Sequence, residues 1–286
     1  MRVLVTGANG QLGSELVDLY RVRASDDVIG RDLPDLDITD RASVAGCFDD
    51  FQPDVVINCA AWTAVDAAEE HEADALRVNG EGPAVLAREC ANRGAWLVQI
   101  STDYVFDGRA TTPYEEDATP NPQSAYGRTK LTGEIAVQEV LPDHHYIVRT
   151  AWLYGVRGAN FVKTILKAQA DRGTVSVVDD QVGQPTYARD LAAQIVVLLD
   201  RRPAAGIFHG TNSGVTSWYG FTQEIFRNWD IDLSAVTPTD SAAFVRPAPR
   251  PAYSVLGHRR WAEVGLAPMR PWVQGLHAAR ADGLQP

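Results

Sequence analysis

The sequence has few of the residues that build disulfide frameworks or membrane spans. Its 286 residues include only three cysteines, Cys47, Cys59 and Cys90, an odd number without the spacing of metal ligands. This set argues against a disulfide scaffold or a metal site and favours a reducing compartment, so we expect a cytoplasmic protein. No stretch approaches the roughly 20 apolar residues that a membrane-spanning helix needs. The first residues already read as a strand, so no signal peptide is expected.

Positive charge is also scarce. Lysine and arginine total 26 against 37 aspartates and glutamates, which gives a formal net charge of −11. Non-specific binding to nucleic acid depends on a basic surface, so this composition argues against a nucleic-acid-binding protein. It leaves open the binding of small anions, because a few local cations can outweigh the field of the whole molecule.

The first 150 residues alternate short apolar runs with longer amphipathic segments. The runs are continuously apolar, as in parallel strands that are covered on both faces. This alternation predicts an α/β fold with a doubly wound parallel sheet. The expected strands are 2–6, 27–30, 54–60, 96–101 and 146–150, and the expected helices are 11–21, 40–51, 66–93 and 124–140.

The pattern is less regular after residue 150. Helices are expected at 159–173 and 190–202, and residues 174–178 could add a strand to the sheet. The stretch 236–255 is rich in proline and arginine and reads as an irregular loop. We therefore predict a smaller lobe at 151–286, of which a part, about 159–200, returns to the main sheet.

A glycine-rich segment, TGANGQLGSEL, follows the first expected strand and opens the first expected helix. The spacing of Gly7, Gly10 and Gly13 differs from Gly-x-Gly-x-x-Gly, but the physics is shared. Without side chains, the backbone N–H groups can approach a pyrophosphate at the helix N-terminus. The segment predicts a Rossmann-type NAD(P)-binding domain at 1–150, which leaves 151–286 as mainly the substrate-binding lobe.

The end of the second expected strand contains both residue types that select between the two dinucleotides. An acid here accepts from the ribose hydroxyl of NAD, whereas an arginine accommodates the 2′-phosphate of NADP. The sequence has Arg31 beside Asp32. We expect Arg31 to contact the cofactor and NADPH to be preferred, with NADH accepted.

A group of three residues, at the end of the fourth expected strand and on the helix after it, indicates proton transfer to the oxygen of a carbonyl group. Tyr126 and Lys130 are four residues apart on an expected helix, so their side chains share one face. Tyrosine can protonate a reduced carbonyl oxygen, and a nearby lysine lowers the pKa of a phenol. Thr102, at the end of a strand, can hold and polarise the carbonyl. Together with the glycine loop, these residues predict a reductase.

The motifs TGANGQLG, STDYVFDG, YGRTK and RTAWLYG resemble those of the extended short-chain dehydrogenase/reductase family. Within that family they are most similar to the nucleotide-sugar ketoreductases that reduce C4 of dTDP-4-dehydro-L-rhamnose. The resemblance runs from residue 1 to about 275, and STDYVFDG is its most specific part. It implies a dTDP-sugar substrate, an NADPH cofactor and a catalytic triad of Thr102, Tyr126 and Lys130, with Lys130 also on the nicotinamide ribose.

The resemblance also implies binding residues. For the cofactor they are Gly7, Gly10, Gln11, Leu12, Gly13, Asp37, Ile38, Ala60, Ala61, Thr63 and Asn79, together with Tyr126 and Lys130. For the substrate they are Val65, Thr102, Asp103, Tyr104, Val105, Trp152 and Arg246, and the candidate cations for the diphosphate are Lys163, Lys167, Arg246 and Arg250.

Some members of the family dimerise around Mg²⁺ held by acidic residues. Glu15 and Asp190 match such positions here, but Arg189 interrupts the acidic pair. We therefore expect no metal ligands in the active site and doubt that Mg²⁺ binds at a dimer interface. The protein could be a monomer or a homodimer.

Other functions share this fold. Sugar-nucleotide dehydratases follow the threonine with Asp-Glu, whereas here Asp103 is followed by Tyr104, which disfavours dehydration strongly and epimerisation less so. A reductase of a related dTDP-4-keto-deoxysugar, giving 6-deoxytalose or an antibiotic sugar such as dihydrostreptose, remains an alternative. A non-catalytic NADP-binding regulatory subunit is the least favoured, because the three catalytic candidates are intact.

Overall fold

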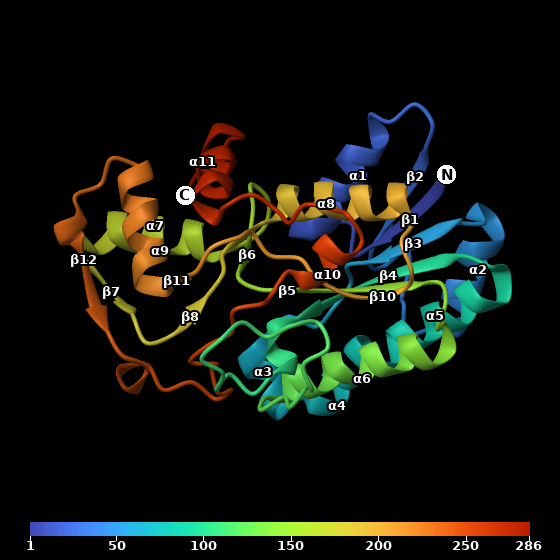
Figure 1. Cartoon of the computed structure of the whole chain (residues 1–286), viewed down its shortest axis with the longest axis horizontal. Coiled ribbons are helices and arrows are strands. Elements are labelled where there is room, and N and C mark those ends of the chain that lie inside the picture. Colours follow the sequence, from blue (N-terminus) through green and yellow to red (C-terminus); the bar gives the residue numbers. More distant parts are fainter.

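The computed structural model describes all 286 residues and is built around one parallel sheet (Figure 1). Six strands lie in the order β10-β5-β4-β3-β1-β2, and every neighbouring pair is parallel. The doubly wound α/β prediction is therefore confirmed. The strands are β1 (Arg2–Thr6), β2 (Asp27–Arg31), β3 (Val55–Asn58), β4 (Trp96–Thr102), β5 (His145–Thr150) and β10 (Gly206–His209).

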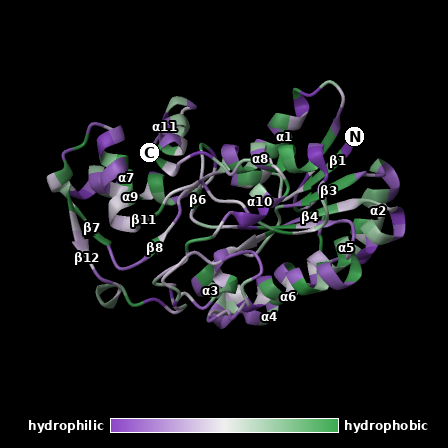
Figure 2. Ribbon diagram, in the orientation of Figure 1, coloured by the Kyte–Doolittle hydropathy of each residue, from purple (hydrophilic) through white to green (hydrophobic).

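Helices cover both faces of the sheet. On one face lie α1 (Gln11–Arg21) and α8 (Ala188–Arg201), which pack against each other. The other face is covered by α2 (Arg41–Phe51), α5 (Gly82–Arg93) and α6 (Ala125–Val140). Strand β3 is buried along its whole length and β1 and β4 along most of theirs, and Figure 2 shows these strands largely in the colour of hydrophobic residues. This burial explains why their sequences are continuously apolar instead of alternating.

One long helix was expected at 66–93, but the structure divides it. The pieces are α3 (Val65–Glu70), α4 (Glu72–Leu76), a π-helical turn (Arg77–Glu81) and α5. The first break is at His71, whose φ and ψ of −124° and 42° are not helical. The π-turn puts Asn79 where its amide bonds both backbone groups of Trp62, which explains part of its departure from regular helix.

The chain beyond β5 forms a second group of elements. These are β6 (Leu153–Tyr154), α7 (Phe161–Arg172), β7 (Val175–Val178), β8 (Val182–Gly183), β9 (Thr186–Tyr187), β11 (Thr216–Ser217), α9 (Trp218–Asn228), β12 (Val236–Thr239) and α11 (Trp272–Ala281), with 3₁₀ turns at Leu233–Ala235 and Ser241–Ala243. Helix α10 (Arg259–Glu263) instead packs on β10, and a further 3₁₀ turn, Asp103–Val105, follows β4. Aromatic and aliphatic side chains of α7, α9 and α11 make a separate core.

Two expectations for this second group need correction. The strand expected at 174–178 forms as β7, but it pairs with β12 and not with the main sheet. The strand that does extend the main sheet is β10, which pairs with β5 and lies after 159–200. The stretch 236–255 is also not wholly irregular, because it begins with β12. None of the helices combines the length and the apolar character needed to cross a membrane.

Candidate active site

A cavity of about 660 Å³ lies at the carboxyl ends of the parallel strands. This is where open α/β sheets place their ligands. Most residues expected at the site line it. They are Gly7, Gly10, Gln11, Leu12, Gly13, Asp37, Ile38, Ala60, Ala61, Thr63, Val65, Thr102, Asp103, Tyr104, Tyr126, Lys130 and Trp152.

The glycine segment packs too closely for side chains. Gly7 has a φ of 62°, and a Cβ built there would lie 2.6 Å from the backbone nitrogen of Ala60. A Cβ on Gly13 would lie 2.2 Å from the carbonyl oxygen of Gly7. These contacts bring the β1–α1 turn against β3 and open α1 directly onto the cavity.

The N-terminus of α1 is suited to an anion. Its N-cap, Gly10, has no side chain to bond the N–H groups of the first turn. These groups, with the positive end of the helix dipole, face the cavity and form a site for a phosphate. The residues present therefore fit the pyrophosphate of a dinucleotide.

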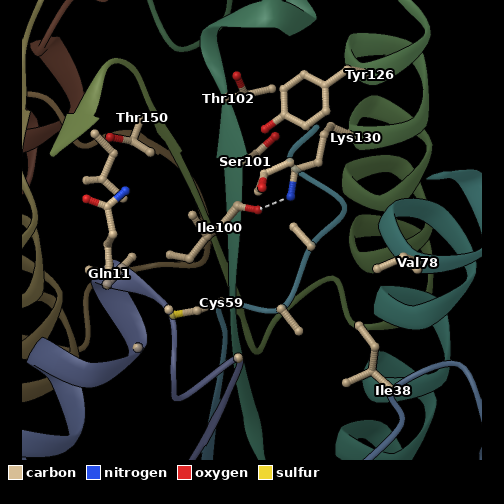
Figure 3. A pocket seen from close by; sticks show the side chains of 18 of the residues that line it. Gln11, Ile38, Cys59, Val78, Ile100, Ser101, Thr102, Tyr126, Lys130 and Thr150 are labelled. Atoms are coloured by element: carbon tan, nitrogen blue, oxygen red, sulfur yellow. Dashed lines mark hydrogen bonds between the residues drawn. The ribbon is translucent and has the colours of Figure 1, made fainter. Parts of the chain in front are cut away.

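Buried polar atoms around the cavity support the same fit. The Oε1 atom of Gln11, the hydroxyls of Ser101 and Thr150 and the Oδ2 atom of Asp103 are buried without a hydrogen-bond partner. Unpaired buried polar atoms are costly, so such a set at one cavity indicates a polar ligand. Figure 3 shows Gln11 and Thr150 on one side of the cavity and Thr102, Tyr126 and Lys130 on the other.

Of the two neighbouring residues at the end of β2, the aspartate faces the cavity and the arginine does not. Asp32 lines it, whereas Arg31 does not. The two Asp32 carboxylate oxygens accept from the backbone N–H groups of Asn9, at 3.0 Å, and Leu33, at 2.9 Å. Strand alternation turns neighbouring side chains to opposite faces, and Arg31 lies toward Cys47 of α2 instead.

Thr102 ends β4 with its hydroxyl already engaged. It donates to Oδ1 of Asp103 at 2.9 Å and accepts from the backbone N–H of Tyr104 at 3.2 Å. A hydroxyl has one proton, so in this arrangement Thr102 has none left to donate to a substrate carbonyl. It can still accept a hydrogen bond.

The phenol of Tyr126 is buried beside Thr102. Burial raises its pKa to about 12, while the Thr102 hydroxyl acts in the opposite direction. The expected lowering of this pKa by Lys130 is not found, because burial sets the direction and Lys130 is not among the groups that shift it. A high pKa keeps the phenol protonated at neutral pH, as a proton donor must be.

Lys130 lies one helical turn from Tyr126. Its ammonium donates to the carbonyl oxygen of Ile100 at 2.6 Å, the bond drawn in Figure 3. Burial lowers its pKa to about 8, opposed by Glu134 and Cys59. The helix and β4 thus hold the ammonium in the cavity wall, where it can contact a ligand hydroxyl.

Thr102, Tyr126 and Lys130 together form one corner of the cavity, and Asp103 is the third titratable group there. Burial raises its pKa to about 6, against the effect of the nearby hydroxyls of Ser254 and Thr102. Ser254 belongs to the stretch after β12, so the C-terminal part of the chain contacts the corner directly.

Trp152 lines the cavity on the side of the second group of elements. Its φ of 47° is in the left-handed region, which for a residue with a side chain costs about 1–2 kcal/mol. Such a conformation persists only where the surroundings hold it, and it is enriched at functional sites.

Four residues expected at the site lie outside the cavity lining: Arg31, Asn79, Val105 and Arg246. Asn79 is buried and joins Trp62 to Thr129 of α6 by hydrogen bonds. Val105 is fully buried against Phe106 and Leu256. Asn79 and Val105 therefore support the cavity wall from behind.

The candidate cations for a diphosphate also lie outside the lining. Arg250 pairs with Asp66 at 2.9 Å, and exposed Arg246 lies 4.0 Å from the same carboxylate. Lys163 donates to the carbonyl of Val156, and Lys167 pairs with Asp171. Asp66 follows Val65 in α3, so the two arginines stand near the substrate side of the cavity.

The two matched acidic residues, Glu15 and Asp190, are each buried or bonded within the chain. The Asp190 carboxylate is bound by the Arg270 guanidinium, at 2.6 and 2.8 Å, and by Asn212. Glu15 is buried, which raises its pKa. No group of three or more histidine, cysteine or acidic side chains is placed to hold a metal ion.

Several lining residues were not expected. Ser101 and Thr150 end two neighbouring strands, a position that could have indicated them. Leu153 lies in the motif RTAWLYG, which could have indicated it, whereas Gly158 comes from the segment after β6, where the sequence has no motif to indicate a cavity. The further unexpected lining residues are Leu33, Leu36, Thr39, Cys59, Val78, Ile100 and Ala151, while Asp32 was considered only as the alternative to Arg31.

The parallel sheet, the glycine turn and the Thr-Tyr-Lys corner are together typical of short-chain dehydrogenases/reductases. The chain belongs to the family described as RmlD substrate binding domain, whose model matches residues 1–283. A dTDP-4-dehydrorhamnose reductase of Streptomyces griseus is 52% identical, over 95% of this chain and 90% of that protein.

Two further comparisons bear on substrate and cofactor. A dTDP-4-keto-6-deoxy-D-glucose reductase of Streptomyces niveus is 49% identical, over 97% of this chain and 96% of that protein. The structure of a dTDP-4-dehydrorhamnose reductase of Bacillus anthracis, in complex with NADP, is 38% identical. It covers 98% of this chain and 99% of its own, with a TM-score of 0.94.

Proposed function

We propose that the protein is an NADPH-dependent ketoreductase that converts dTDP-4-dehydro-L-rhamnose to dTDP-L-rhamnose. The observation that carries the proposal is the corner formed by Thr102, Tyr126 and Lys130, which shares one cavity with the glycine turn. Membership of the family and the reductase relatives support the same reaction.

The residues of the corner have complementary roles in this proposal. NADPH, when bound, supplies the hydride for C4 of the sugar. Tyr126 donates its phenolic proton to the C4 oxygen, and its high pKa keeps that proton available at neutral pH. Thr102 lies beside the phenol and is itself oriented by Asp103, because its hydroxyl donates to Oδ1 of that carboxylate. Lys130 holds the ribose and stabilises the phenolate that forms.

The proposal includes NADPH as the preferred cofactor, with NADH also accepted. The B. anthracis reductase in complex with NADP supports this choice. Asp32 would disfavour a 2′-phosphate, but both of its oxygens already accept backbone hydrogen bonds. The ribose pocket thus contains one acid whose charge is already partly satisfied.

A second ketosugar is the main alternative. The S. niveus relative is named for dTDP-4-keto-6-deoxy-D-glucose, at nearly the same identity as the S. griseus reductase. With dTDP-4-dehydro-L-rhamnose itself, the same corner would give rhamnose or 6-deoxytalose, according to the face of C4 that receives the hydride. The proposal further places the enzyme in the cytoplasm, as a monomer or a homodimer.

The test is NADPH oxidation with dTDP-4-dehydro-L-rhamnose, followed by NMR of the product sugar. We expect saturable oxidation and dTDP-L-rhamnose as the product, and slower oxidation with NADH in parallel. A product with the other configuration at C4 would support the reductase activity but change the identity of the sugar that the enzyme makes. Saturable NADPH binding without oxidation of any dTDP-ketosugar would contradict the proposal and favour a binding protein.

Tyr126→Phe is the matched control, because it removes only the hydroxyl. Loss of a general acid typically lowers the rate by about 10²–10⁴-fold, so we expect kcat to fall by this factor. NADPH affinity should change little, as measured by fluorescence titration. Loss of rate and NADPH affinity together would mean that Tyr126 is structural.

A further inference from the structure

Two tryptophans from distant parts of the chain are stacked at the substrate side of the cavity. The ring centroids of Trp152 and Trp218 lie 3.6 Å apart, with 10° between the ring planes. Trp152 lines the cavity, whereas Trp218 does not. Trp218 opens α9, in the second group of elements shown in Figure 1.

The backbone of Trp152 is held in place around this stack. Its left-handed φ is accompanied by a hydrogen bond from the N–H of Thr186 to its carbonyl, at 3.1 Å. The next two residues form β6, which pairs with β9. The indole therefore projects from a backbone that cannot relax without breaking these contacts.

Gly183 leaves the space in which the indole lies. A Cβ at this position would lie 2.7 Å from Cε2 and Cζ2 of Trp152. The φ of Gly183 is not in the left-handed region, so the requirement is for space and not for backbone freedom. Gly183 also pairs with Thr216, where β8 and β11 meet. Thr216 is two residues before Trp218, so this pairing links the two ends of the stack.

Trp218 is itself supported from behind. Its ring contacts Phe161, with centroids 4.4 Å apart, and both rings pack on the core that includes Phe221. Trp152 is thus enclosed between a rigid aromatic core and the cavity. Stacked aromatic pairs contribute beyond the area that they bury, so this arrangement fixes the plane of the exposed indole face.

We propose that Trp218 is a positioning residue for the deoxysugar of the substrate and that it acts through Trp152. The inference rests on the proposed function, because it assumes that the sugar lies against the free face of Trp152. An apolar face of a 6-deoxysugar suits a flat indole wall, and a wall of fixed plane holds C4 at a constant height above Tyr126 and the nicotinamide side of the cavity.

The decisive variant is Trp218→Leu, which keeps an apolar side chain and removes the stack. We expect the KM for dTDP-4-dehydro-L-rhamnose to rise about three- to tenfold, the size of an aromatic pair contribution. NADPH affinity should remain at the wild-type value, because the glycine turn is untouched. Trp218→Phe should recover most of the KM.

Coupling between the two residues separates positioning from general packing. If Trp218 acts through Trp152, the double variant with Trp152→Leu should have the KM of Trp152→Leu alone. Independent, multiplying effects would overturn the inference. The circular dichroism couplet of stacked indoles should vanish in either single variant, and a lost couplet with wild-type KM would also overturn it.

Two further variants guard against a loss of folding. Trp229→Leu removes a tryptophan from the other end of α9 without touching the stack, and should leave KM and the couplet unchanged. Gly183→Ala displaces the Trp152 ring while Trp218 stays, and should raise KM as Trp218→Leu does. Wild-type enzyme that turns over no dTDP-ketosugar would refute the proposed function first, whereas turnover with equal KM in all variants would refute this inference alone.

Discussion

At the scale of single residues, Asp103 shows how burial sets the chemistry of the corner. It has one oxygen bonded to Thr102 and one without a partner, and its pKa is raised to about 6. At neutral pH the carboxylate is therefore charged although burial disfavours its charged form. In return, the carboxylate fixes the direction of the Thr102 hydroxyl, and through it the side of Thr102 that is open to Tyr126.

This cost predicts a pH-dependent effect of Asp103→Asn on stability. The folded-state pKa lies above the solvated value of 3.8, so the folded protein binds this proton more tightly than the unfolded chain. The contribution of Asp103 is therefore most favourable below about pH 4 and is lost as the pH rises through about 6. Asp103→Asn should stabilise by about 1–3 kcal/mol at about pH 8 and by little at about pH 4.

Urea unfolding at the two pH values measures this difference. Asp50→Asn, on the exposed side of α2, serves as the control for loss of a carboxylate. An Asp103→Asn effect that is the same at both pH values would show that desolvation is not its cause.

The sequence predicted the identities of these residues better than their properties. The spacing of Tyr126 and Lys130 placed both side chains on one helix face, as found. The direction of the Tyr126 pKa could not be predicted, because burial depends on the whole packed corner. The same holds for Arg31 and Asp32, since adjacent residues face opposite ways and the motif does not say which faces the ligand.

At the scale of elements, a buried ion pair joins α6 to the sheet. Arg149 of β5 donates to both Glu134 oxygens, with the shortest contact at 2.7 Å, and both side chains are at most 1% exposed. Glu134 is one turn beyond Lys130. The pair therefore fixes the helix that contains Tyr126 and Lys130 to the strand beside β4.

Glu134→Gln should be strongly destabilising, because it leaves the Arg149 charge buried and unpaired. Removing one partner of a buried pair typically costs about 3–5 kcal/mol. The matched control is Glu72→Gln, which breaks the bidentate pair with Arg128 on the exposed side of α6 and should cost about 1 kcal/mol or less. Equal costs in chemical denaturation would mean that the buried pair contributes no more than a surface one.

Elements with strong local signals were predicted well, and elements set by tertiary contacts were not. Helix α1 has the bounds that the sequence suggested, because a glycine turn precedes it and its apolar face is regular. The breaks near His71 and Asn79 accompany contacts with Trp62 and with α6, which a local sequence pattern does not reveal. Strand β7 was visible as an apolar run, but its partner β12 was not.

At the scale of the whole molecule, the main sheet depends on residues from both halves of the chain. The core between the sheet and α1 contains 20 buried residues, and nine of them come after residue 150, from Leu191 to Met269. Strand β10 forms one edge of the same sheet and pairs with β5. The division at residue 150 thus remains a prediction about function, separate from how the core is built.

A fragment of residues 1–155 tests whether that division is also a folding boundary. It lacks α8, β10 and Trp261, so part of one face of its sheet is uncovered. We expect it to bind a hydrophobic dye and to unfold without a cooperative transition, unlike the full chain. A cooperative transition with NADPH binding would establish an independent nucleotide-binding domain.

The late position of β10 and Trp261 has a consequence for the protein as it leaves the ribosome. The five strands before residue 150 emerge first and can pair, but their outer edge and part of one face stay open until the remaining chain arrives. An unpaired edge of a parallel sheet is a site of association between chains. Slow synthesis of the second half would therefore prolong the period in which newly made copies can aggregate through β5, the strand that β10 pairs with in the finished enzyme.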